Sequence, residues 1–164
     1  MGKPVVVQGD SVQGTDKHNV MGSGPTPPGL PFSGTGTYKY LGSMSDNLST
    51  FVKIAGKPVA LVTSKSSLNQ GEILPPTGGH SGPAGNPFTA GPGSGAAQPM
   101  PLTVMILDVI GIGVPNASAG SALLTVGGAK VLLDGDKIDT CDGTGSKANS
   151  TVTAVGQSFV SCSG

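Results

Sequence analysis

The stretch that decides the fold is GKPVVVQGDSV at residues 2–12, because its pattern returns as GAKVLLDGDKI at residues 128–138. The two copies align without gaps: Gly-x-x-Val is followed by two residues, the second apolar, and then by x-Gly-Asp-x-aliphatic. The opening letters, GKPV, also recur at residues 56–59. Chance matching in a glycine-rich chain is the alternative, but a four-residue identity together with an eleven-residue pattern argues against it. We interpret the pattern as a β-hairpin unit of about ten residues that is used three times.

Apolar runs around these copies predict strands. FVKI at residues 51–54 and LLTV at residues 123–126 lead into Ala55-Gly56 and Gly127-Gly128, which predicts two tight hairpin turns. The only helix candidate, residues 43–51, contains Ser and Asn and lacks an apolar stripe. The expected fold class is therefore all-β. The predicted strands cover residues 4–7, 50–54, 59–63, 102–109, 122–126, 130–133, 150–155 and 158–161.

The length of 164 residues fits a single domain, 1–164. The 28 Gly and 14 Pro concentrate in two stretches, which predicts loop insertions at about 21–43 and 81–101. The nine Lys balance nine acidic residues and no Arg is present, so a clustered basic surface for nucleic acid is not expected. The apolar run at 102–114 is too short to span a bilayer. The first residues lack the apolar core of a secretory signal, so we expect folding in the cytoplasm.

The chain holds only two His and two Cys, and each repeat is followed by one of them. The first repeat runs on to His18, the second to His80 and the third to Cys141, while Cys162 lies at the end of the last predicted strand. Two imidazoles and two thiolates suit one tetrahedral structural zinc. Ordinary surface histidines and cysteines, or a disulfide between the cysteines, are the alternatives. Where three hairpins converge there is little room for a core, and a metal can replace one.

Enzyme motifs are weak in this sequence. The glycine-rich stretches at 22–24 and 91–95 lack the Gly-Lys-Ser/Thr ending of a phosphate loop. His80 is not accompanied by a G-x-S-x-G elbow. The acidic run from Asp134 to Asp142 lacks the terminal Glu of an EF-hand, so we interpret it as a solvated turn. We therefore expect no catalytic activity.

The repeated units resemble the PAAR-repeat family of spike-tip proteins. The resemblance rests on residues 3–10, 52–62 and 125–136 and covers most of the chain except the two Gly/Pro-rich stretches. It implies a small β cone of three hairpin units with pseudo-threefold symmetry and a zinc at the apex. The sequence departs from the family in having no Pro-Ala-Ala-Arg string, and two His with two Cys replace the usual three His and one Cys.

The resemblance implies a structural tip on the trimeric spike (VgrG- or gp5-like) of a contractile injection system, with one tip per trimer. Such a tip is assembled in the cytoplasm, pierces the target membrane on firing and can carry effector cargo. A β-structured virion or surface adhesin that binds a receptor is the alternative function.

Overall fold

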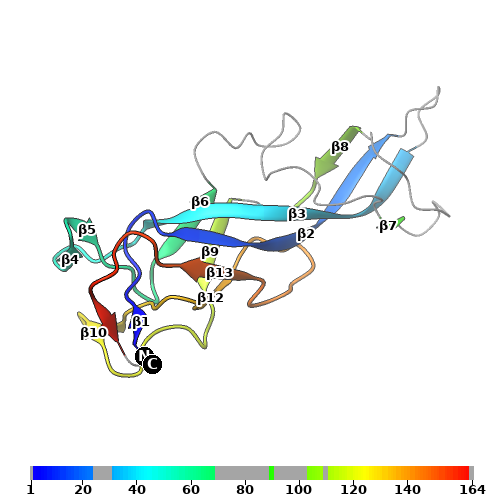
Figure 1. Ribbon diagram of the computed structural model, residues 1–164. Coiled ribbons are helices and arrows are strands. Elements are labelled where there is room, and N and C mark those ends of the chain that lie inside the picture. The colour runs from blue at the N-terminus through cyan, green and yellow to red at the C-terminus, as the bar shows by residue number, and fades with distance from the viewer. Residues whose placement is uncertain (1, 24–30, 69–88, 91–102, 109–110, 163–164) are drawn as a thin grey trace.

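The computed structural model describes residues 2–23, 31–68, 89–90, 103–108 and 111–162 (Figure 1). Within these ranges every regular element is a strand, so the all-β prediction is confirmed, and no helix there is long and apolar enough to cross a bilayer. The strands are β1 (Lys3–Pro4), β2 (Ser11–Ser23), β3 (Pro31–Asp46), β4 (Lys53–Ile54), β5 (Lys57–Pro58), β6 (Lys65–Leu68), β7 (Thr89–Ala90), β8 (Thr103–Ile106), β9 (Ile112–Pro115), β10 (Thr125–Val126), β11 (Ala129–Lys130), β12 (Lys137–Asp139), β13 (Ser150–Thr153) and β14 (Ser161–Cys162).

Six strands close into an antiparallel barrel in the order β2, β3, β6, β9, β12, β13 and back to β2. A closed barrel leaves no unpaired edge among these six strands where they overlap. The β2–β3 pair is by far the longest, with Ser11 opposite Ser43 at one end and Ser23 opposite Pro31 at the other. Beyond the barrel, β8 pairs with β2 and β7 pairs with β3, so this hairpin projects from the body of the molecule (Figure 1).

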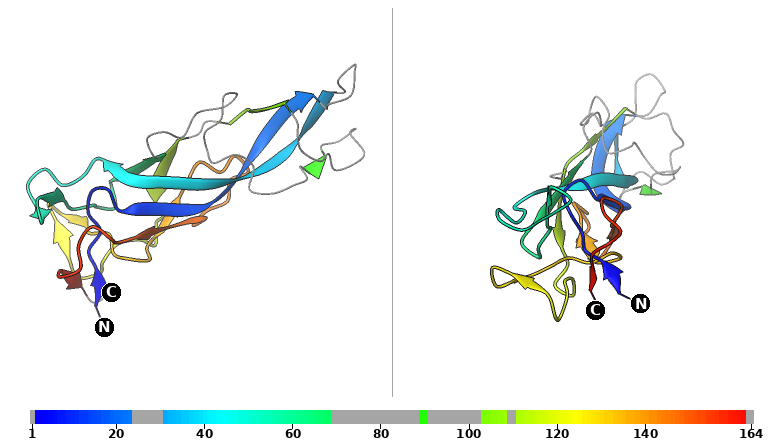
Figure 2. Two further views of the ribbon diagram at one scale, coloured as in Figure 1. Left: turned by 45° about the horizontal axis from the view of Figure 1, so that its top comes forward. Right: turned by 60° about the vertical axis from the view of Figure 1, so that its left-hand side comes forward.

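Three two-stranded sheets gather at the opposite end (Figure 2). Two of them are the hairpins predicted at Ala55-Gly56 and Gly127-Gly128, and both predictions are confirmed. All four turn residues have positive φ, between 50° and 85°, which matches the right-handed twist of the flanking strands. The third sheet pairs β1 with β14, so it is built from the two ends of the chain.

The segments that follow these sheets, residues 5–7, 59–61 and 131–133, join one another in a closed cycle. Backbone bridges link Val7 with Val59, Leu61 with Val131, and Leu133 with Val5. Hydrogen bonds between the middle residues run the same way round: Val6 N donates to Leu132 O (3.0 Å), Leu132 N to Ala60 O (3.0 Å) and Ala60 N to Val6 O (2.9 Å). The cycle satisfies the backbone groups of three segments that are far apart in sequence.

This cycle separates two hydrophobic clusters, because successive residues of an extended chain face opposite ways. The middle residues Val6, Ala60 and Leu132 join the cluster inside the barrel, with Val12, Tyr40, Met44, Ala119, Ile138 and Val152. Their neighbours form the second cluster, at the end of the two-stranded sheets: Val5, Val7, Ile54, Val59, Leu61, Val131 and Leu133.

The prediction of a loop at 21–43 is wrong at both ends of that range. Residues 21–23 complete β2 and residues 31–43 belong to β3, while 24–30 lie outside the described residues. Glycine recurs in these two strands, and pairing of the strands with each other holds it extended despite its low strand propensity. The second predicted loop, 81–101, lies outside the described residues except for β7, which is a strand. The helix candidate at 43–51 is the end of β3 followed by irregular chain.

Candidate metal centre

The candidate site lies inside the barrel, on the inner face of β2. Alternate residues of a strand face opposite sides of the sheet. Val12, Asp16 and His18 are completely buried, whereas the intervening residues Thr15 and Lys17 are exposed. The barrel interior is therefore apolar next to the cycle of backbone hydrogen bonds and polar further along β2.

Asp16, His18 and Cys141 form a group whose ligand atoms all lie within 4.8 Å of one another. Asp16 and His18 come from β2, and Cys141 follows the end of β12 by two residues. Barrel closure brings them together: Gly14 of β2 pairs with Ser150 of β13, and β13 in turn pairs with β12.

Asp16 is held by hydrogen bonds from three different side chains. Its Oδ1 accepts from the hydroxyl of Thr140 and from Nδ2 of Asn149, and its Oδ2 accepts from Cys141 Sγ at 3.2 Å. Thr140 N donates to Asn149 Oδ1 at 3.0 Å, which fixes the amide that faces the carboxylate. The carboxylate therefore has a defined position, with Oδ2 directed at the thiol.

The Cys141 thiol is kept protonated by its surroundings. Burial raises its pKa to about 12, and the adjacent Asp16 carboxylate adds to the increase by disfavouring a second negative charge. A backbone hydrogen bond from Gly111 N to Cys141 Sγ, at 3.4 Å, acts in the opposite direction. A cation placed between these groups would reverse the balance, because a coordinated thiol loses its proton.

His18 is positioned from two sides. Its Nδ1 lies 3.4 Å from Oδ2 of Asp108, and the same oxygen accepts a hydrogen bond from Asn19 N at 2.6 Å. The ring of Tyr38 meets the imidazole edge-on, with centroids 5.6 Å apart, and burial raises the pKa of the Tyr38 hydroxyl. A carboxylate behind one ring nitrogen is the arrangement that orients a metal-ligating histidine.

A carboxylate, an imidazole and a thiol are all groups that can ligate a metal ion, and their spacing can be compared with that of a tetrahedral zinc site. Zinc bonds are about 2.3 Å to sulfur and about 2.0–2.2 Å to nitrogen and oxygen, so tetrahedral ligand atoms lie roughly 3.3–3.7 Å apart. The Cys141 Sγ to Asp16 Oδ2 distance of 3.2 Å and the 4.8 Å limit of the group bracket that range. The group is therefore compact enough to be a candidate metal site.

The structure brings together two of the four predicted ligands, His18 and Cys141. Cys162 is not part of the group: it packs in the second hydrophobic cluster, and its Sγ lies 3.3 Å from Ser121 Oγ. His80 lies outside the described residues. No disulfide joins the two cysteines in the structure. Asp16 was missed, although its place two residues before His18 on one strand face is a usable signal.

Comparisons with known proteins give no relative. No family model matches this chain, and neither a curated protein nor a solved structure matches it.

Proposed function

We propose that this chain is a structural tip: a metal-pinned β cone that caps a trimeric spike of a contractile injection system. The observation that carries the proposal is the closed cycle of equivalent backbone hydrogen bonds between residues 5–7, 59–61 and 131–133. In this view one chain has pseudo-threefold symmetry. Such a chain can sit as a single copy on a true threefold partner, with each repeat facing one partner chain.

Equivalence of the three repeats extends to their turns. At the end of each segment a side chain three residues ahead accepts the backbone N–H: Asp10 from Val7 (2.7 Å), Ser64 from Leu61 (2.8 Å) and Asp136 from Leu133 (2.9 Å). A rigid body built this way resists deformation, because every segment end is fixed by both backbone and side chain. Rigidity is what a piercing tip needs.

Asp16, His18 and Cys141 would hold a structural zinc in the polar part of the barrel interior, and His80 remains the predicted fourth ligand. A bound zinc would link side chains from β2 and from the segment after β12, which stabilises the fold on the order of 10 kcal/mol in small structural sites. In this role Asp108 would orient His18 through Nδ1. Asn149 and Thr140 would hold Asp16.

In this proposal the chain has no catalytic role. It would be assembled on the spike in the cytoplasm and carried through the target envelope when the machine fires, with transient membrane contact and with effector cargo as a passenger. The end away from the three two-stranded sheets would lead, and the end with those sheets would meet the spike.

Co-purification with the trimeric spike protein of the same organism tests the proposal. A complex of one chain with three spike chains, containing one zinc, is the expected result. A protein that forms its own trimer and binds no spike would instead favour the adhesin function. Zinc below about a tenth of an ion per chain, in protein purified without chelator, would remove the metal from the proposal.

A further inference from the structure

Three exposed apolar side chains occupy the same position in the three repeats: Phe51, Leu123 and Phe159. Their exposed fractions are nearly equal, at 70%, 72% and 68%. Scattered single apolar residues on a surface need no explanation, but equal exposure at equivalent positions does.

The local structure that exposes them is the same each time. In each repeat a side-chain oxygen accepts a hydrogen bond from the backbone N–H three residues later: Ser49 from Val52 (3.0 Å), Ser121 from Leu124 (3.0 Å) and Gln157 from Val160 (2.8 Å). Two exposed residues lie between acceptor and donor in each turn, and the second of them, two positions after the acceptor, is the large apolar one. These turns precede β4, β10 and β14, which lie at the end of the molecule with the two-stranded sheets (Figure 2).

The charge of this end differs in sign from that of the rest of the chain. Residues 2–7, 49–61, 121–133 and 157–162 contain four Lys and no acidic residue. The remaining sequence contains five Lys and all nine acidic residues. A partner that docks here is therefore expected to carry acidic groups around its apolar contacts, because they would complement the positive charge of this end.

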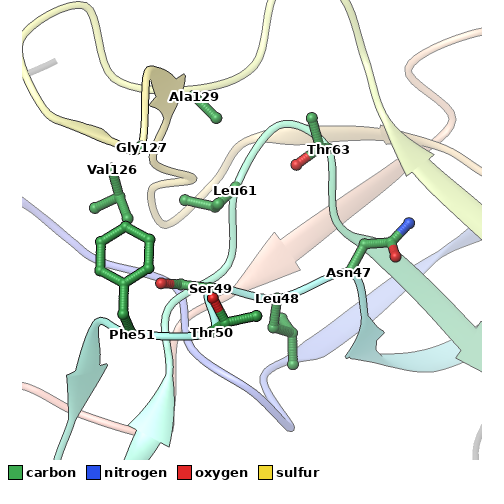
Figure 3. Close-up of a pocket in the computed structure, with 10 residues that line it drawn as sticks. All are labelled: Asn47, Leu48, Ser49, Thr50, Phe51, Leu61, Thr63, Val126, Gly127 and Ala129. Carbon is green, nitrogen blue, oxygen red and sulfur yellow. The ribbon is translucent and has the colours of Figure 1, made fainter.

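A hollow of about 520 Å³ lies beside one of the three residues (Figure 3). It separates the turn at residues 47–51 from the hairpin at 126–129, with Phe51 and Val126 on one side and Leu61 at its floor. An apolar side chain of a partner can enter it next to Phe51. Apolar pockets beside aromatic side chains are where binding energy concentrates in interfaces.

We propose that Phe51, Leu123 and Phe159 are the anchors through which this end docks on a threefold-symmetric partner, one anchor per partner chain, against an acidic surface. The inference rests on the proposed function, whose partner is the trimeric spike. At about 70% exposure the three side chains offer about 400 Å² of mainly apolar surface. That is about half of the roughly 800 Å² that each side of a stable interface buries.

Binding of the full chain to the trimeric spike protein of the same organism, measured by calorimetry, tests the anchors. Phe51→Ser alone should weaken binding about 10- to 100-fold, and the triple change Phe51→Ser, Leu123→Ser, Phe159→Ser should abolish it. Val155→Ser is the matched control, because Val155 is equally exposed at 70% but lies outside the three turns; it should change affinity less than threefold. All variants should keep the wild-type melting temperature, since none removes a buried group.

The possible outcomes distinguish a wrong assignment of the anchor residues from a wrong proposed function. If the wild type binds the spike and the triple variant binds equally well, the anchors are wrong and the proposed function stands. If the wild type does not bind, both the function and this partner are wrong. If sedimentation shows that the wild type associates with itself through these residues, and the triple variant is monomeric, the face joins copies of this chain and the docking inference is overturned.

Discussion

Replacing Asp10 tests whether side chains at the segment ends hold the three-segment cycle together. Asp10 is completely buried, and its carboxylate accepts three backbone hydrogen bonds. Oδ2 accepts from Val7 N at 2.7 Å, and Oδ1 accepts from Val155 N at 2.9 Å and Gly156 N at 2.6 Å. Asp10→Ala would leave all three donors without this acceptor.

The expected loss follows from those contacts. Each buried donor left unsatisfied costs about 1–3 kcal/mol, and water can reach the donors at 155 and 156 more easily than the one at Val7. We expect Asp10→Ala to lower the free energy of unfolding by about 3–5 kcal/mol, a large share of the 5–15 kcal/mol of a typical domain. Ser64→Ala is the internal comparison. Ser64 holds only Leu61 N and the carbonyl of Asn47, so about 1–2 kcal/mol should be lost.

Urea unfolding followed by circular dichroism measures both variants, with the slope compared to confirm that only stability changes. The loss of stability for Asp10→Asn should lie between the losses for Asp10→Ala and Ser64→Ala, because one of the two side-chain oxygens remains. The reasoning is refuted if Asp10→Ala costs no more than Ser64→Ala, since the number of donors left without an acceptor would then not determine the loss.

Three further predictions concern packing, the metal and the chain ends. Gly14→Ala should destabilise strongly or prevent folding, since a Cβ there would clash with the carbonyl oxygen of Asn149. Gly135→Ala, with open space around its Cβ and φ of +83°, should cost only about 1–2 kcal/mol, and thermal melts compare the two variants. Cys141→Ser should lose bound zinc while Cys162→Ser keeps it, as measured by elemental analysis; equal loss in both would place Cys162 among the ligands. A circularly permuted chain would begin at Gly56 and join residues 164 and 1 through a Gly-Gly turn. It should fold with an unchanged circular dichroism spectrum, because β14 already pairs with β1. The spectrum of an unfolded chain would contradict that pairing.

The predicted hairpins were accessible to sequence reasoning because their signals are local. A glycine-containing pair between two short apolar runs specifies a tight turn wherever it occurs, and both examples are present. The long strands β2 and β3 were not accessible in the same way. Their inner faces carry Asp16, His18 and Tyr38 as well as the apolar residues Val12, Tyr40 and Met44. The alternation of apolar and polar residues that marks a strand is therefore interrupted.

In the candidate site, too, some residues could be predicted from the sequence and others could not. His18 and Cys141 could be selected from the sequence because the chain has so few soft ligands. Their union with Asp16, and the placement of Cys162 in the other hydrophobic cluster, depend on which strands become neighbours when the barrel closes. Spacing along the chain does not place Cys141 beside Asp16 and His18, since it lies more than a hundred residues from both.

The sequence by itself determined the all-β class and the two tight turns, because each depends on backbone preferences within a few residues. Only the tertiary structure decided the closed barrel, the pairing of β1 with β14 and the group around Asp16. These features need backbone hydrogen bonds and side-chain contacts between distant segments. Such contacts form when burial of the two hydrophobic clusters compensates for the entropy lost in closing the long loops between those segments.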